Sequence, residues 1–199
     1  MSDNIFPVFN QIQNKEDKEK LLKQNAKVIW MTGLSGCGKT TIAAALEKEL
    51  YKRGYLTQIL DGDNIRSGIN NNLSFTLDDR YENIRRISEV SKLFLHCGII
   101  TINCFVSPTA EIREMARGII GEENFIETFV DTTLEVCEER DIKGLYKLAR
   151  AGKIKDFTGI TSPYEIPANP EIHIITKDKT LEECVNEVLE YILKEIKFV

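Results

Sequence analysis

The stretch GLSGCGKTT at residues 33–41 restricts the possible folds more than any other part of this sequence. Gly33, Gly38, Lys39 and Thr40 match the pattern G-x-x-x-x-G-K-[ST], in which glycines let backbone N–H groups turn inward around phosphate oxygens. The apolar run VIWM precedes the loop and a helical pattern follows it, which is the context that this motif requires. The sequence therefore predicts a nucleotide-binding α/β fold.

Apolar runs typical of buried strands alternate with helical periodicity along the rest of the chain. The runs are VIWM (28–31), YLTQIL (55–60), IITINCFV (99–106), FIETFV (125–130) and EIHIIT (171–176). Between the first two runs, Ile42, Leu46 and Leu50 recur every four residues, as on one face of a helix. This alternation predicts a five-stranded parallel sheet with helices on both faces.

Threonines and glycines indicate where the helices begin and end. Three pairs have the spacing of a capping box at a helix start: Thr76 with Asp79, Thr132 with Glu135, and Thr180 with Glu183. Gly54 and Gly98 stand where two of the helices should end.

Length and composition favour one domain and a small-molecule ligand. A chain of 199 residues with 42% hydrophobic residues is long enough for one core, which we assign to residues 25–199, after an N-terminal arm of residues 1–24. Residues 10–25 are polar and predict a surface helix or an extended arm. The formal net charge of −5 argues against a general nucleic-acid binder, since such binding needs clustered Lys and Arg.

The sequence also predicts a cytoplasmic protein that does not bind membranes. It shows no basic and apolar leader and no run of 18 apolar residues. The five cysteines lack a C-x-x-C pair and fall mostly in apolar periodic segments, so we expect reduced thiols and no disulfide frame or zinc site.

The phosphate-binding loop is expected to hold ATP. Leu34, Ser35, Gly36 and Cys37 complete the loop between the motif positions. The Lys39 ammonium would meet the β- and γ-phosphates, and the hydroxyl of the following Thr would ligate Mg²⁺. The motif alone does not distinguish a kinase from an ATPase or a nucleotide-dependent switch.

Asp61 and Asp63 follow the second predicted strand, in the stretch DGDNIRSGINNNLSFTLDDRYENIRR at residues 61–86. Ligands of open parallel sheets bind beyond the carboxyl ends of the strands, so both carboxylates should share an edge with the phosphate-binding loop. There they could divide between holding Mg²⁺ and accepting a proton from an attacking hydroxyl. The same letters also suit an ordinary turn, but the position beside the loop favours function.

Several further stretches make the sequence similar to the adenylyl-sulfate kinase family, also called APS kinases. They are DGDNIR, LSFTLDDRYENIRR, FVSP, RDIKGLYKLARAGKIKDFTGI and SPYEIPANPE, in the family's order and at compatible spacing over roughly residues 25–195. The resemblance implies a P-loop kinase that transfers the γ-phosphate of ATP to the 3′-hydroxyl of adenosine 5′-phosphosulfate, giving PAPS and ADP in sulfate activation.

The resemblance also implies roles for individual residues. Asp63 would be the acidic residue at the reacting hydroxyl, supported by Asp61, which would also hold the metal. Ser107 matches the family's phosphoserine position, although direct in-line transfer needs no such intermediate. The residues implied to bind the phosphosulfate, the ribose and the adenine of the acceptor are Arg66, Arg80, Asn83, Phe75 and Phe157.

Residues 140–155, RDIKGLYKLARAGKIK, carry a net charge of +5, and we call them the basic segment. Lys143, Lys147 and Arg150 have the spacing of one helical face. We expect the segment to be a lid over two polyanionic nucleotides, with Arg140 at ATP and Lys143 at the acceptor, and not only a solvated helix face.

The sequence leaves two alternative functions and two possible assemblies to be considered. Another small-molecule kinase, for a nucleoside monophosphate, shikimate or gluconate, would share the fold. A binding-only switch is disfavoured, because it would not need a carboxylate base. Neither a homodimer nor an association with ATP sulfurylase, which would make the acceptor, can be decided from these residues.

Overall fold

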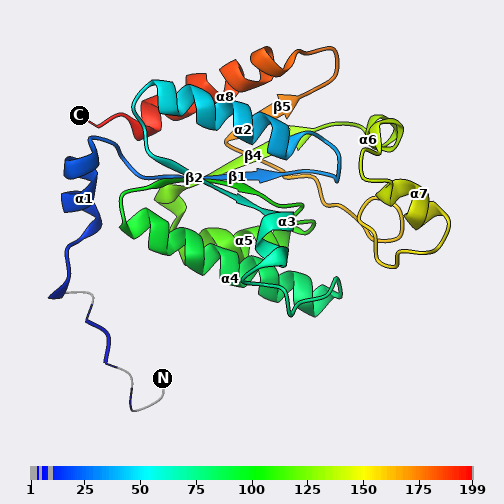
Figure 1. Ribbon diagram of the computed structural model, residues 1–199, viewed down its shortest axis with the longest axis horizontal. Helices are drawn as coiled ribbons and strands as arrows, with labels where there is room; N and C mark the ends of the chain where they lie inside the picture. Colours follow the sequence, from blue (N-terminus) through cyan, green and yellow to red (C-terminus); the bar gives the residue numbers. More distant parts are fainter. Residues whose placement is uncertain (1–3, 5, 9–10, 199) are drawn as a thin grey trace.

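The computed structural model describes residues 4, 6–8 and 11–198, and in this part of the chain one parallel sheet is enclosed by helices (Figure 1). The five strands are β1 (Val28–Thr32), β2 (Thr57–Asp61), β3 (Ile100–Cys104), β4 (Phe125–Asp131) and β5 (Ile172–Ile175). Their order in the sheet is β2-β3-β1-β4-β5, and every pair is parallel. The predicted five-stranded parallel sheet is confirmed.

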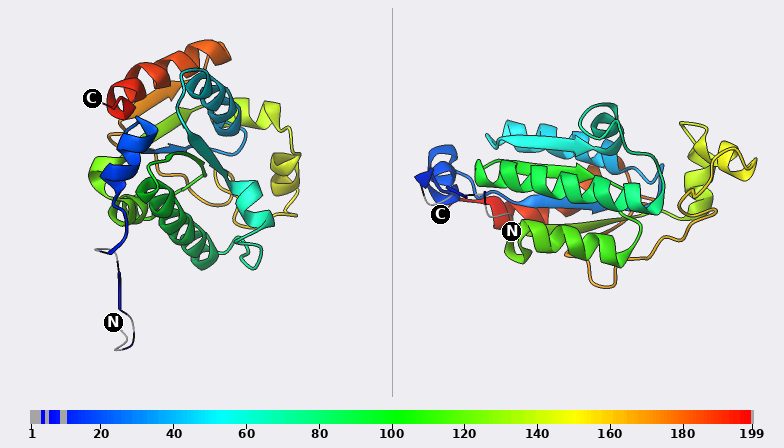
Figure 2. Two further views of the ribbon diagram at one scale, coloured as in Figure 1. Left: turned by 60° about the vertical axis from the view of Figure 1, so that its left-hand side comes forward. Right: turned by 90° about the horizontal axis from the view of Figure 1, so that it is seen from below.

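Helices cover both faces of the sheet, as predicted (Figures 1 and 2). One face is covered by α2 (Lys39–Lys52) and α8 (Leu181–Ile196), and the other by α4 (Leu77–His96) and α5 (Ala110–Ile120). Strand β1 is buried along its whole length, and its side chains alternate between the two cores, with Ile29 and Met31 on one side and Val28 and Trp30 on the other. Such a strand needs apolar residues at every position, which explains the continuous run VIWM.

The position of β1 places the phosphate-binding loop at the centre of the sheet. The chain builds β2 and β3 on one side of β1 and then β4 and β5 on the other. The loop after β1 therefore leaves the sheet at the point where the winding direction reverses, which is where open parallel sheets form their ligand crevice.

The structure confirms two of the three threonines that were predicted to cap helix starts. Thr76 and Thr180 accept hydrogen bonds from the backbone N–H groups of Asp79 and Glu183. The prediction for Thr132 is wrong by one residue, because Thr133 caps α6 (Leu134–Arg140). The hydroxyl of Thr132 instead donates to the Cys37 carbonyl at 3.0 Å, a partner that lies 95 residues away and leaves no local signal. Gly54 and Gly98, which follow α2 and α4, have the positive φ expected of residues after a helix end.

The polar N-terminal segment contains a helix, α1 (Lys15–Leu22), at the end of the sheet opposite to the phosphate-binding loop (Figures 1 and 2). Gln24, which follows it, is buried, and its amide nitrogen donates to the carbonyls of Leu56 and Gly98 at 3.0 and 2.7 Å. The chain is therefore fixed to the body of the protein just before β1 begins.

The remaining elements are short. They are α3 (Gly62–Ser67), α7 (Leu145–Arg150) and the 3₁₀-helix η2 (Glu122–Asn124). In the right-hand view of Figure 2, which shows the molecule from below, α6 and α7 project beyond the carboxyl ends of the strands. All five cysteines are free. Among the residues that the structure describes, none of the helices combines the length and the apolarity of a membrane span.

Candidate active site

The phosphate-binding loop depends on two glycines for its shape. Gly33 has φ +147°, and a Cβ atom there would lie 2.6 Å from the carbonyl oxygen of Val130, so no side chain fits. Gly38 has φ +110° and precedes the first residue of α2. Because a glycine cannot cap the helix with a side chain, the N–H groups of the first turn are left for an anion.

The carbonyl groups of the loop are held from outside by distant residues. Tyr146 donates to the carbonyl of Ser35 at 2.8 Å, Arg140 to that of Gly36 at 3.5 Å, and Thr132 to that of Cys37. In a trans peptide, the carbonyl and the following N–H point in opposite directions. The N–H groups of Gly36 and Gly38, which follow the carbonyls of Ser35 and Cys37, therefore point into the loop, where phosphate oxygens would lie. The N–H of Cys37 donates to the Leu34 carbonyl at 3.3 Å.

Lys39 lies inside the loop that it is predicted to serve. Its side-chain ammonium donates to the carbonyls of Gly33 and Leu34, both at 2.8 Å, and the residue is 8% exposed. The thiol of Cys37 lies 3.5 Å from the same ammonium and is buried. The positive charge is thus held against the backbone of the loop by two of its carbonyls.

Thr40 and Asp61 meet at the base of the loop. The Thr40 hydroxyl donates to Oδ2 of Asp61 at 2.7 Å, and Oδ1 of Asp61 caps α3 by accepting the N–H of Asp63 at 3.0 Å. A hydroxyl and a carboxylate side by side are hard oxygen ligands and fit Mg²⁺, which is bound by few protein groups and keeps waters and substrate phosphates. In the part of the chain that the structure describes, no cluster of three or more His, Cys, Asp or Glu forms a closed metal cage.

Asp63 is the exposed carboxylate of the site. Its side chain is 72% exposed, and it forms an ion pair with Lys143 of the basic segment. Lys143 was predicted to share a helical face with Lys147 and Arg150, and this prediction is wrong. Lys143 lies in the turn between α6 and α7, because Gly144 with φ +68° separates it from the second helix, and Arg150 pairs with Glu138 of α6.

The basic segment is in contact with both halves of the site. Arg140 and Tyr146 touch the phosphate-binding loop, and Lys143 touches Asp63 on the acceptor side. Tyr146 is buried, its ring packs edge-on against Phe157 at 5.0 Å, and burial raises the pKa of its hydroxyl above the ordinary value. The segment is therefore joined to the core by a tyrosine that the charge pattern did not single out.

Arg66 and Arg80 connect the segments that are predicted to bind the acceptor. The Arg66 guanidinium lies 4.4 Å from the ring centre of Phe75, and its Nη1 donates to the carbonyl of Ser74 at 2.8 Å. Arg80 donates to the carbonyl of Phe75 at 2.9 Å and to the hydroxyl of Thr158 at 2.7 Å. Burial lowers the pKa of both guanidinium groups, in Arg66 with a further contribution from the nearby Arg80 charge.

The two phenylalanines of the predicted adenine clamp have different surroundings. Phe75 is 60% exposed, whereas Phe157 is half-buried against the core and Tyr146. Arg80 also bonds the carbonyl of Asp156, so one guanidinium links the segments that carry both rings. The arrangement brings the segments together, with the Phe157 ring anchored in the core and the Phe75 ring exposed beside the Arg66 guanidinium.

Asn83 is the last of the predicted acceptor residues. It lies on α4, one turn after Arg80, and is 4% exposed. Its side-chain oxygen accepts a hydrogen bond from Nδ2 of Asn70 at 3.0 Å.

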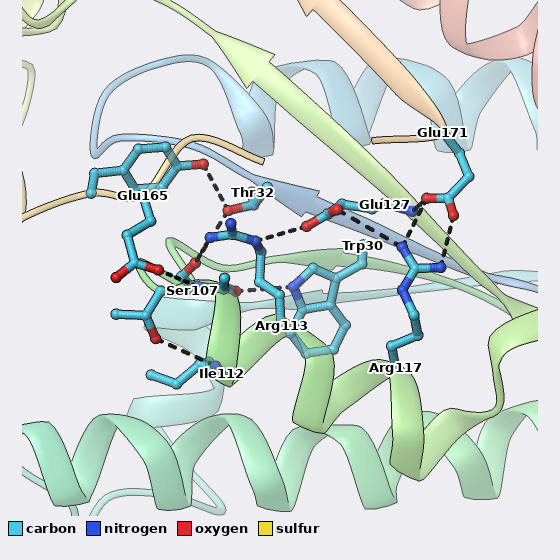
Figure 3. A network of polar contacts seen from close by, with 12 residues as sticks. Trp30, Thr32, Ser107, Ile112, Arg113, Arg117, Glu127, Glu165 and Glu171 are labelled. Carbon is cyan, nitrogen blue, oxygen red and sulfur yellow. Dashed lines mark hydrogen bonds and ion pairs between the residues drawn. The ribbon is translucent and has the colours of Figure 1, made fainter. Parts of the chain in front are cut away.

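Ser107 lies in a buried polar network at the end of β3 (Figure 3). The residue is 2% exposed, and its hydroxyl accepts a hydrogen bond from the indole N–H of Trp30 at 2.9 Å. Its carbonyl accepts from Arg113 at 2.9 Å, which holds Ser107 at φ +43°. In this geometry the hydroxyl is enclosed and already has a partner.

The same network extends across the sheet to β4 and beyond (Figure 3). Nε of Arg113 lies 2.8 Å from a carboxylate oxygen of Glu127, and both side chains are less than 10% exposed. Burial raises the pKa of Glu127, while the charge of Arg113 opposes that shift. Arg117 forms a two-point contact with Glu171, at 2.7 and 3.1 Å. These pairs fix the loop after β3 at the carboxyl edge of the sheet.

Pattern reasoning missed several residues that shape this site. Tyr146 lies within the quoted stretch RDIKGLY, so its family motif was a usable signal for it. The contacts of Thr132, Arg113 and Glu127 were missed because their partners are distant in sequence and no local pattern indicates them.

Sequence similarity to known proteins shows the family of this chain. The family model described as "Adenylylsulphate kinase" matches residues 25–175. The chain belongs to the adenylyl-sulfate kinase family. The adenylyl-sulfate kinase of Bacteroides thetaiotaomicron is 59% identical over 195 residues, covering 98% of this chain and 97% of that protein.

Solved structures of the family are similar in fold as well. The structure of the Mycobacterium tuberculosis APS kinase in complex with AMPPNP and APS is 45% identical, with a TM-score of 0.80, covering 83% of this chain and 96% of that one. The hexameric APS kinase from Thiobacillus denitrificans is 27% identical, with a TM-score of 0.66, and the match covers 87% of this chain and 30% of that chain. Family members are ATP-dependent kinases, and this chain is a member by both sequence and fold.

Proposed function

We propose that this chain is an adenylyl-sulfate kinase, which transfers the γ-phosphate of ATP to the 3′-hydroxyl of adenosine 5′-phosphosulfate and releases PAPS and ADP. The observation that carries the proposal is the position of Asp63. This exposed carboxylate stands two residues after Asp61, which bonds Thr40 of the phosphate-binding loop, and it is paired with Lys143. A base beside a phosphate cradle is what a hydroxyl acceptor requires and what a binding-only switch lacks.

On the donor side, the chain supplies fixed positive charge. The inward N–H groups of the loop and the Lys39 ammonium would bind the β- and γ-phosphates, and Arg140 adds charge at Gly36. Charge develops on the transferred group and on the leaving ADP oxygen during transfer, so these fixed donors stabilise the transition state more than the bound reactants.

On the acceptor side, Asp63 would take the proton of the 3′-hydroxyl. At the same time the hydroxyl oxygen bonds to the γ-phosphorus, and the bond between that phosphorus and the ADP oxygen breaks. Lys143 engages one carboxylate oxygen and leaves the other for the hydroxyl. Thr40 and Asp61 would hold Mg²⁺, which neutralises phosphate charge when bound. Direct transfer of this kind gives the enclosed Ser107 a structural role.

The acceptor nucleotide would be held by groups that match its chemistry. The guanidinium forks of Arg66 and Arg80 suit phosphate and sulfate oxygens, and the amide of Asn83 suits ribose or phosphosulfate oxygens. The rings of Phe75 and Phe157 would stack on the adenine, with Phe157 as the fixed side.

We further propose that the basic segment acts as a lid. Its present contacts, from Arg140 to the loop and from Lys143 to Asp63, span both nucleotide positions. Closing over two polyanions would reduce their repulsion and exclude water that could hydrolyse ATP.

We place this activity in the cytoplasm, where free thiols such as these five persist, with residues 25–199 as the catalytic domain and residues 1–24 as an arm. A homodimer and a complex with ATP sulfurylase are the two assemblies to test, by light scattering of the chain alone and of its mixture with that enzyme.

The test is ADP release from MgATP by the purified chain, with and without adenylyl sulfate, repeated for Asp63→Asn. We expect release that depends on adenylyl sulfate and a kcat about 10²-fold or more lower in the variant, with the Kd for ATP unchanged. Asp78→Asn, the same change at an exposed position in the first turn of α4, is the matched control and should keep wild-type rates. Release that adenylyl sulfate does not stimulate would refute the proposed acceptor.

A further inference from the structure

Two buried asparagines join the acceptor loop to helix α4. Asn70 lies in the loop after α3 and is fully buried, and Asn83 on α4 is 4% exposed. Nδ2 of Asn70 donates to the side-chain oxygen of Asn83 at 3.0 Å and lies 3.5 Å from its backbone carbonyl. A buried polar contact of this kind has a defined direction, because each amide has one accepting and one donating end.

The direction of this contact is set from outside by an arginine. Nη1 of Arg86 lies 3.5 Å from the side-chain oxygen of Asn70, and Nε of Arg86 donates to Glu82 at 2.7 Å. A guanidinium only donates, so it requires an oxygen on the Asn70 atom that faces it. The Asn70 amino group must then face Asn83 and engage its oxygen.

Because the side-chain oxygen of Asn83 is engaged by Asn70, the side-chain amino group of Asn83 is left for another partner. Within the described residues it donates to no protein group, and it is not among the enclosed polar atoms that lack a partner. Since Arg80 lies on the same face of α4 one turn earlier, this amino group is presented where the acceptor side of the site begins.

We propose that Asn70 is a positioning residue that makes Asn83 present a hydrogen-bond donor, and not its carbonyl, to the acceptor nucleotide. This inference rests on the proposed function. The oxygens of a phosphate or sulfate group are acceptors, so a donor is the end that binds them. A flipped Asn83 amide would instead place its own oxygen against theirs.

The shape of the loop does not depend on the Asn70 side chain. The backbone N–H of Asn70 donates to the Ile65 carbonyl at 3.0 Å, and its own carbonyl accepts from Leu73 at 3.1 Å. Arg66 also holds the carbonyls of Leu73 and Ser74. The loop therefore has its own support, which allows the side chain to be changed while the backbone stays in place.

The test is Asn70→Asp, which keeps the shape of the side chain and replaces its donor with a second acceptor. Asn83 would then have to donate to the new carboxylate and turn its oxygen toward the nucleotide. We expect the KM for adenylyl sulfate to rise about 10-fold to 100-fold, the change that corresponds to an unmade hydrogen bond of roughly 1–3 kcal/mol. The KM for MgATP and the kcat at saturating acceptor should stay within about twofold.

Two further variants make the result decisive. Asn72→Asp adds the same charge beside the same arginine, because Asn72 also accepts from Arg86, at 2.9 Å, but the residue is exposed and has no contact with Asn83. It should match the wild type. Asn70→Ser keeps a donor hydroxyl, and we expect a smaller rise in the KM for adenylyl sulfate than in Asn70→Asp.

The outcomes separate this inference from the proposed function. Absence of adenylyl-sulfate-dependent turnover in the wild type would refute the function itself. If the wild type is active, equal KM values for adenylyl sulfate in the two Asp variants would overturn the positioning role. Equal rises in the KM for adenylyl sulfate and for MgATP, together with a lowered melting temperature, in both Asn70→Asp and Asn70→Ser would also overturn it, because they would indicate a structural role.

Discussion

Removing Arg113 tests the buried network that fixes the loop after β3. In Arg113→Met the partner Glu127 stays buried with its charge, and the carbonyl of Ser107 loses its donor at 2.9 Å and keeps only the Thr32 hydroxyl at 3.5 Å. Breaking a buried ion pair from one side costs about 3–5 kcal/mol. Arg117 lies 3.8 Å from Glu127 and offsets part of this loss, so we expect about 3 kcal/mol, the low end of that range.

The expected loss is large enough to measure by thermal unfolding. For a chain of this length, about 3 kcal/mol corresponds to a fall in Tm of roughly 6–12 °C. The double variant Arg113→Met with Glu127→Leu should recover to within about 1 kcal/mol of the wild type or exceed it, because an apolar pair carries no desolvation cost. Arg53→Met breaks the exposed pair with Glu49 as the control and should cost about 1 kcal/mol or less.

The pH dependence of the Arg113→Met loss provides a second readout. Burial already raises the pKa of Glu127 above 4.5, and removing the opposing charge raises it further. The folded variant then binds a proton more tightly than the unfolded chain, so its deficit relative to the wild type should shrink as the pH is lowered from 7 toward about 4.5. A deficit below about 1 kcal/mol at pH 7, or a double variant no more stable than the single one, would refute this reasoning.

Two other predictions concern the acceptor site and helix α4. Phe75→Ala should raise the KM for adenylyl sulfate about 5-fold to 100-fold, because stacking is lost, and should leave the KM for MgATP unchanged. The Tm should barely change, since the ring is 60% exposed. Steady-state kinetics measure the two KM values, and Leu77→Ala, at another exposed apolar position, is the control. The pKa of Glu82 is lowered from 4.5 to about 2 by Arg85 and Arg86, so its stabilising effect is complete above pH 4.5 and is lost as the pH falls toward 2. Thermal unfolding should therefore show a cost of about 0.5–1 kcal/mol for Glu82→Gln at neutral pH that disappears in acid, and a pH-independent cost would contradict the assignment.

Much of the fold was predictable because it depends on short-range patterns. The run VIWM predicts a strand buried on both faces, and the spacing of Ile42, Leu46 and Leu50 predicts the helix that follows the loop. Capping by Thr76 and Thr180 depends on backbone N–H groups only three residues away. Local signals fail where a distant partner competes for the side chain, as the Cys37 carbonyl does for Thr132.

The candidate site was predictable in its residue types but not in its contacts. The sequence motif indicates that Lys39 and Thr40 meet phosphates and metal, and family resemblance selects Asp63, Arg80 and Asn83. The basic character of residues 140–155 was evident, yet the turn at residues 141–144 that separates α6 from α7 was not, because helical spacing alone does not detect the positive φ of Asp141 and Gly144.

The sequence by itself determined the alternation of strands and helices, the phosphate-binding loop and the membership of the adenylyl-sulfate kinase family. These depend on residues that are neighbours in the chain. Only the tertiary structure decided the strand order, the pairing of Lys143 with Asp63 across 80 residues, and the burial of Arg113 against Glu127. Such contacts depend on which surfaces the packed layers bring together, and the amino-acid pattern around each partner does not specify its distant neighbour.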